Sequence, residues 1–162
     1  MTRHWMVTGF AVMVWTLVAM ALPALARDEV LLTLTRPDGS EVALDRAALS
    51  DIQQDEFTTS TIWTDGPQTF RGVRLATLLD HVGVEGAQLQ LVAANGYRVE
   101  RDLEGMLAED ALIALERNGR QMSLREKGPV WLVYNYDSDT RLQTEVIYAN
   151  SIWQLDRIEV TD

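Results

Sequence analysis

Apolar and polar residues alternate in short runs along most of this chain, a pattern typical of strands. Residues 30–35 and 41–44 flank the turn sequence Arg36-Pro37-Asp38-Gly39-Ser40 and predict a hairpin. Further strands are expected at 56–63, 88–94, 97–101, 111–116, 130–134 and 152–160, with a loop at 64–68. Asn-Gly pairs at 95–96 and 118–119 predict tight turns, the first of type I′.

Helical patterns are fewer and shorter than the strand patterns. Leu75, Leu78, Leu79 and Val82 recur at i, i+3, i+4 and i+7, which predicts a two-turn amphipathic helix that ends at Gly83. We expect Asp45 to cap a helix over 46–51, and a further short helix at 103–109. The sum is an α+β fold: a single β-rich domain with short helices.

The first 26 residues read as an export signal. One arginine lies near the start, residues 5–22 are almost wholly apolar, and Pro23-Ala24-Leu25-Ala26 supplies an A-x-A cleavage pattern. The alternative is an uncleaved anchor, since about 20 apolar residues are long enough to span a bilayer. We expect cleavage before Arg27, a periplasmic location, and a domain over 27–162.

The composition of the chain argues against several classes of function. The net charge of -10 becomes -11 without residues 1–26, which hold one Arg and no acid, and this balance argues against nucleic-acid binding. No cysteine is present, and His81 is the only histidine beyond the leader, so a thiolate or histidine metal site is not expected. No catalytic motif or spaced acid–base pair is found either.

Aromatic residues are the most informative candidates for binding. Trp63, Trp131 and Trp153 each lie near a predicted element end, close to Gly, Pro or Asn. They are either core residues or the walls of a site for a planar heterocycle, whose ring stacks while amides and hydroxyls read its edge. Asn95, Tyr97 and Tyr134 are the matching polar candidates, although Asn95 has an equally good role in the turn.

Three charged residues are candidates for the rim of such a site. Arg71 precedes the predicted helix and Arg125 precedes Gly128-Pro129, so each is placed to offer a guanidinium to a phosphate or carbonyl oxygen. Asp137 is placed to accept N–H donors from an aminopyrimidinone, the head group of a pterin. Solvated surface positions are the alternative for all three.

The order of short motifs resembles the sulfite-oxidase-type molybdopterin-binding domain. The matching segments are W-T-D-G at 63–66, F-R-G-V-R-L-A-T-L-L at 70–79, A-N-G-Y at 94–97, R-N-G at 117–119, G-P-V-W-L-V at 128–133 and I-W-Q-L-D-R-I-E at 152–159. The resemblance implies that fold and a pterin-type ligand. Molybdenum enzymes of the family bind the metal through a cysteine upstream of the second motif, where this chain has Thr58-Thr59-Ser60-Thr61. The family's terminal lysine, near the cofactor phosphate, aligns with Trp153.

These departures resemble the small exported, cysteine-free branch typified by PruR-type periplasmic pterin-binding proteins. That resemblance implies a non-catalytic ligand sensor that binds a pterin without molybdenum. It also implies that occupancy is reported to the periplasmic region of an inner-membrane diguanylate cyclase/phosphodiesterase. Two alternatives remain: a molybdopterin-dependent oxidoreductase or its accessory subunit, and an interaction module with an empty pocket.

Overall fold

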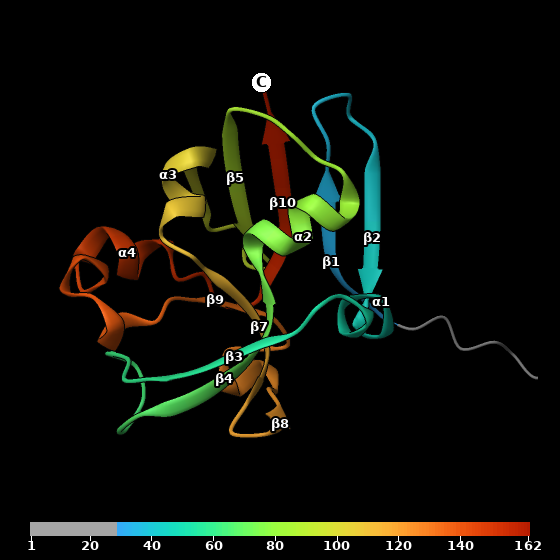
Figure 1. Cartoon of the computed structure of the whole chain (residues 1–162). Helices are drawn as coiled ribbons and strands as arrows, with labels where there is room; N and C mark the ends of the chain where they lie inside the picture. Colours follow the sequence, from blue (N-terminus) through green and yellow to red (C-terminus); the bar gives the residue numbers. More distant parts are fainter. Residues whose placement is uncertain (1–28) are drawn as a thin grey trace, which may run out of the picture.

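The computed structural model describes residues 29–162, in which the strands form two sheets (Figure 1). The predicted leader at 1–26 lies outside the described residues. The first sheet has the order β2-β1-β10-β5-β6. Only β1 and β10 pair in parallel; the other neighbours are antiparallel. Its strands are β1 Val30–Thr35, β2 Glu41–Asp45, β5 Gln88–Ala93, β6 Arg98–Asp102 and β10 Leu155–Thr161.

The second sheet is antiparallel and has the order β3-β4-β7-β8, with β9 pairing with the other end of β7. Its strands are β3 Asp55–Thr59, β4 Gln68–Arg74, β7 Leu112–Arg117, β8 Arg120–Gln121 and β9 Trp131–Val133. Asn118 and Gly119 both have positive φ in the two-residue turn between β7 and β8, as type I′ requires.

The helices are short and follow the local signals. Asp45 accepts a hydrogen bond from the Ala48 amide and caps α1, and α2 ends at the left-handed Gly83 as predicted. In Figure 1, α2 crosses in front of the first sheet, and its buried leucines belong to the main core. The helices are α1 Arg46–Asp51, α2 Leu75–Val82, α3 Leu103–Ala108 and α4 Glu145–Asn150; the 3₁₀ turns are η1 Leu124–Glu126, η2 Tyr136–Ser138 and η3 Thr140–Leu142.

The two sheets are joined where β9 runs beside the segment that leads into β10. Trp131 and Trp153 form an isolated antiparallel bridge. The Leu132 amide donates to the Ile152 carbonyl at 2.9 Å, and the Leu155 amide donates to the Val130 carbonyl at 3.0 Å. One strand of each sheet is thereby fixed beside the other, and the aromatic residues at the junction are positioned by backbone hydrogen bonds.

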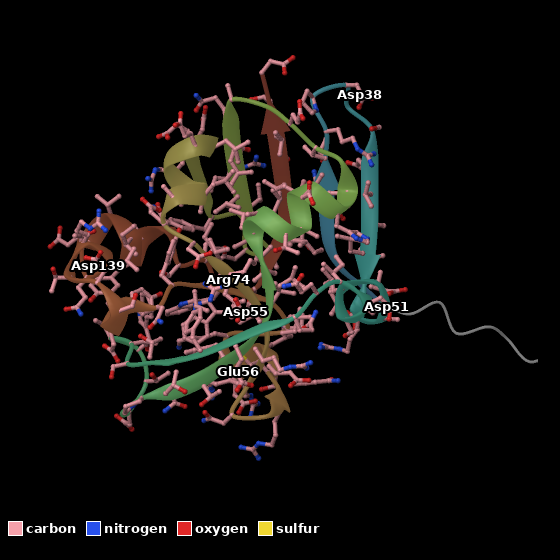
Figure 2. All side chains as sticks on the ribbon, viewed as in Figure 1. Asp38, Asp51, Asp55, Glu56, Arg74 and Asp139 are labelled. Carbon is pink, nitrogen blue, oxygen red and sulfur yellow. The ribbon has the colours of Figure 1, made fainter. Side chains whose placement is uncertain are left out.

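The α+β prediction is confirmed, but several element predictions are wrong. The strand expected over 56–63 ends at Thr59, and the terminal strand begins at Leu155 rather than 152. Neither β4 nor α4 was predicted. A salt bridge between Arg74 and Asp55, with Nε and Oδ2 2.6 Å apart, links the end of β4 to the start of β3 (Figure 2). No helix among residues 29–162 is long and apolar enough to cross a membrane.

Gly72 is required where β4 bulges against β7. The register shifts between Arg71 and Gly72, and a Cβ on Gly72 would overlap the Ile113 carbonyl of β7. We expect Gly72→Ala to lower the free energy of unfolding by about 1–3 kcal/mol, the usual range for overpacking. Denaturant unfolding measures the change.

Gly105→Ala is the comparison variant, because its Cβ would meet a side-chain end and not backbone: the Asp102 carboxylate, which accepts from the Gly105 amide and caps α3. Alanine is favoured over glycine in a helix by about 1 kcal/mol, which offsets the weakening of this cap, so we expect a smaller loss of stability than in Gly72→Ala. Equal losses in the two variants would contradict the assignment of a backbone clash to Gly72.

Candidate functional site

A hollow of about 260 Å³ opens between the β5–β6 turn, α4 and the segment that precedes β10. Its walls are mainly aromatic and small apolar residues, with a few uncharged polar groups at the rim. The lining residues are Trp63, Ala93, Asn95, Tyr97, Tyr148, Ala149, Ser151, Ile152 and Trp153. Four of the nine predicted site residues therefore meet here: Trp63, Asn95, Tyr97 and Trp153.

Trp63 lies at the centre of the aromatic residues around the hollow. It comes from the loop between β3 and β4, and its ring packs edge to face against Tyr148 and Trp153, each with a centroid separation of 5.7 Å. On its inner side it meets Trp131 at 5.9 Å and Tyr136 at 6.3 Å. Such contacts add about 0.5–1.5 kcal/mol each beyond burial, so the Trp63 ring is held rigidly.

The polar rim is formed by the turn between β5 and β6. This turn is not the predicted type I′: the Gly96 amide donates to Ala93 O and only Gly96 has positive φ, which gives a three-residue loop. Asn95 Oδ1 accepts a hydrogen bond from the Tyr97 amide at 3.0 Å, so part of its role is structural. Its amide nitrogen has no hydrogen-bond partner within residues 29–162 and remains available as a donor.

Tyr97 spans the edge of the hollow. Its hydroxyl donates to the Ala149 carbonyl on α4 at 3.2 Å, while 47% of the residue stays exposed. Trp153 is 40% exposed on the same rim. Two large aromatic side chains therefore present ring surface to solvent beside a hollow, an arrangement typical of small-molecule sites.

Trp131 and Tyr134 do not line the hollow, although both were predicted as contact residues. Both are fully buried, and neither Trp131 Nε1 nor the Tyr134 hydroxyl has a hydrogen-bond partner among residues 29–162. Burial raises the pKa of the Tyr134 phenol far above its usual range. Trp131 instead packs edge to face against the rings of Trp63 and Trp153.

The three charged candidates lie outside the hollow. Arg71 is half-exposed on β4 and its Nη1 is 3.8 Å from Glu116 Oε2, while Arg125 is exposed on η1. Asp137 Oδ2 accepts from the Ser60 amide at 2.6 Å, and its own amide donates to Thr59 Oγ1 at 3.1 Å. Asp137 thus fixes the segment in which the resemblance places the family's cysteine.

Sequence reasoning missed Tyr148, Ser151 and the other α4-side residues of the hollow. The sequence signal that could have predicted α4 is Thr144, whose hydroxyl accepts a hydrogen bond from the Ile147 amide and caps the helix. Ser151 is buried at the end of this helix; its hydroxyl lies 2.6 Å from that of Tyr136 and donates to Ile147 O at 2.8 Å.

Comparison with known proteins assigns the fold to a family. The family model described as "Oxidoreductase molybdopterin binding domain" matches residues 42–162. The chain belongs to this family.

Among solved structures, the chain is similar to the sulfane dehydrogenase SoxCD from Paracoccus pantotrophus, with 17% sequence identity and a TM-score of 0.59. The match covers 81% of this chain and 38% of the SoxCD chain, so it spans well under half of that protein and concerns the fold. Among curated proteins, none has a sequence that matches this one.

The hollow fits one part of a molybdopterin-type cofactor better than the rest. Its aromatic faces and the Asn95 amide suit a flat heterocycle with donor and acceptor groups on its edge. The chain has no cysteine to ligate molybdenum. In the described part of the chain no three His, Asp or Glu residues are grouped for a metal, and no lining residue is cationic toward a phosphate.

Tyr134 and Tyr136 offer a matched test of the packing behind the hollow. We expect Tyr136→Phe to cost about 1 kcal/mol because its hydroxyl is paired with Ser151. Tyr134→Phe removes an unpaired buried hydroxyl and should leave the free energy of unfolding unchanged or raised. Chemical denaturation measures both, and a larger loss for Tyr134→Phe would contradict these environments.

The same two phenols predict a loss of stability in alkali. Burial raises the pKa of both Tyr134 and Tyr136, so the folded protein keeps protons that the unfolded chain releases near pH 10. Their contribution is complete below about pH 10 and declines as pH rises above it. Unfolding measured at several alkaline pH values should show a shallower decline in Tyr134→Phe; an unchanged decline would show that Tyr134 is not the source.

Proposed function

We propose that this domain binds a pterin in the hollow beside Trp63 and Trp153 and catalyses no reaction. The observation that carries the proposal is the pair of partly exposed indoles next to the Asn95–Tyr97 turn. A bicyclic pterin stacks on such faces, and its aminopyrimidinone edge needs the mixed donor and acceptor character that an amide side chain supplies. Membership of a family described by molybdopterin binding supports the same ligand class.

The size of the hollow also supports a small ring system. Pockets for drug-sized ligands have volumes of about 300–1,000 Å³, and this one, at about 260 Å³, falls just below that range. The Ala149 carbonyl and the hydroxyls of Tyr97 and Ser151 at its edge are engaged in hydrogen bonds within the protein. We therefore expect stacking to supply most of the affinity and the free Asn95 amide to orient the ring.

The non-catalytic part of the proposal rests on the 58–61 segment. Its hydroxyl-bearing residues stand where the resemblance places the metal-binding cysteine, and a hydroxyl is a poor substitute for a thiolate on a soft metal. Thr59 is fully buried, and its hydroxyl accepts the Asp137 amide proton. The segment is thus organised by hydrogen bonds within the protein.

The second candidate function is a molybdopterin-dependent oxidoreductase or its accessory subunit, which the family match favours. Metal analysis of protein purified from its native host separates the two. Stoichiometric molybdenum is the result expected for the oxidoreductase, and its absence together with bound or bindable pterin is the result expected for the sensor.

We also propose that the protein is exported and signals to a membrane partner. The proposed partner is the periplasmic region of an inner-membrane diguanylate cyclase/phosphodiesterase, which would distinguish pterin-bound from pterin-free protein. Exposed apolar residues near the hollow, Ile62 at 61% and Val146 at 60%, support contact with another protein. The mass of secreted protein tests export, with a chain beginning at Arg27 expected; pterin-dependent binding to the purified partner region tests signalling.

The binding proposal predicts a large effect of Trp153→Ala. Stacking of a base on an aromatic side chain contributes about 1–3 kcal/mol, so we expect the affinity for a pterin to fall about tenfold or more. Tryptophan quenching and calorimetry measure the affinity, and Trp63→Phe should give a smaller loss because a ring remains.

Ile62→Ala is the matched control, since Ile62 is exposed beside Trp63 but does not line the hollow. It should bind pterin like the unaltered protein. Saturable binding that survives Trp153→Ala in a folded variant would contradict the assigned site, and no binding of any pterin at micromolar concentration would contradict the proposed function.

A further inference from the structure

The electrostatics of the hollow point to a selection by charge. We infer that the site takes an electrically neutral pterin and rejects phosphorylated pterins. This inference rests on the proposed function and specifies the class of ligand within it. It follows from the lining of the hollow, the position of the cation nearest to the indoles, and the charge of the whole protein.

None of the nine residues that line the hollow is Asp, Glu, Lys, Arg or His. Two of the three lining hydroxyls are also engaged within the protein: Tyr97 donates to Ala149 O, and Ser151 is paired with both Tyr136 and Ile147 O, while the third, on Tyr148, is uncharged. A phosphate brought into this hollow would lose water without gaining a cationic partner. Desolvating an unpaired charge is far more costly than desolvating a neutral ring.

Lys127 is the only lysine of the chain, and it is occupied elsewhere. Its Nζ lies 4.0 Å from the centroid of the Trp153 ring and 5.7 Å from that of Trp131, in cation–π contact with both. Lys127 does not line the hollow. Its ammonium therefore stabilises the orientation of Trp153 and is not presented to the ligand.

The neighbouring arginine is similarly turned away. Arg98 follows Tyr97 on β6, and its Nη1 donates to Gln90 Oε1 at 2.7 Å. Like Lys127, Arg98 does not line the hollow, and both cations make their contacts with other protein groups.

The charge of the whole protein acts in the same direction. The net charge is -10, and Figure 2 shows labelled carboxylates at widely separated positions, from Asp38 and Asp51 to Asp139. A phosphate monoester carries about -1.5 to -2 at neutral pH and is repelled by such a field. Because salt screens this repulsion beyond about 8 Å at physiological ionic strength, the discrimination should weaken as salt is added.

The test compares neopterin with neopterin monophosphate, which share a ring and a carbon side chain and differ in the phosphate. Calorimetric titration of the secreted protein is carried out at low and at physiological ionic strength. We expect the monophosphate to bind about tenfold more weakly or worse, with a smaller difference at the higher salt.

Substitution of Ala149 offers a way to reduce the discrimination. It is exposed and lines the hollow, so Ala149→Arg places a guanidinium at the rim, while Ala149→Gln matches its polarity without charge. We expect the arginine variant to narrow the preference several-fold and the glutamine variant to keep it. If neither variant changes the preference, the selection is not electrostatic and the inference fails.

Other outcomes separate this inference from the proposed function. Equal or tighter binding of the monophosphate overturns charge selection and leaves pterin binding intact. Tighter binding that is lost in Lys127→Gln would show that the Lys127 ammonium moves away from Trp153 and binds the phosphate, contrary to the role assigned to it here. If neither compound binds, it is the proposed function that fails.

Discussion

Hydrogen bonds between the β9 region and the segment before β10 join the two sheets, and the candidate site is built on that junction. Gln154 makes three of the hydrogen bonds at this junction. Its amide donates to Lys127 O, its carbonyl accepts from the Ala94 amide, and its side chain donates to Leu124 O. Both Gln154 and Lys127 have positive φ, a conformation that non-glycine residues adopt only where surrounding contacts determine it. The junction therefore sets the backbone on either side of Trp153.

The aromatic residues divide into two groups because of this geometry. Trp131 lies on the buried side of the bridge and Trp153 on the exposed side, so paired neighbours in the backbone have different roles. Trp63, from the loop after β3, packs against both at 5.9 and 5.7 Å between centroids, and Trp131 and Trp153 also contact each other at 6.4 Å. A rigid inner group supporting a partly exposed outer group is a physical basis for a preformed ring-binding surface.

The sequence predicted the elements whose signals are local. The hairpin of β1 and β2 and the exact bounds of α2 follow from turn residues, alternation and Gly83. It missed β4 because its bulge at Gly72 breaks the alternation, and α4 because only Ile147 and Asn150 of its six residues are buried. Among the site residues, the sequence singled out the three tryptophans as a group, and two of them line the hollow. It did not separate Trp131 from Trp153, because burial depends on which side of the junction each side chain faces.

The central claim is that a pterin binds against Trp63 and Trp153, and the indole N–H signals in a nuclear magnetic resonance titration test it most directly. In the chain that begins at Arg27, the indoles are those of Trp63, Trp131 and Trp153, and single Trp→Phe variants assign their N–H signals. The account predicts large shifts for Trp63 and Trp153 on addition of a neutral pterin and a much smaller shift for the buried Trp131. Shifts confined to backbone amides elsewhere, with all three indoles unchanged, would contradict it.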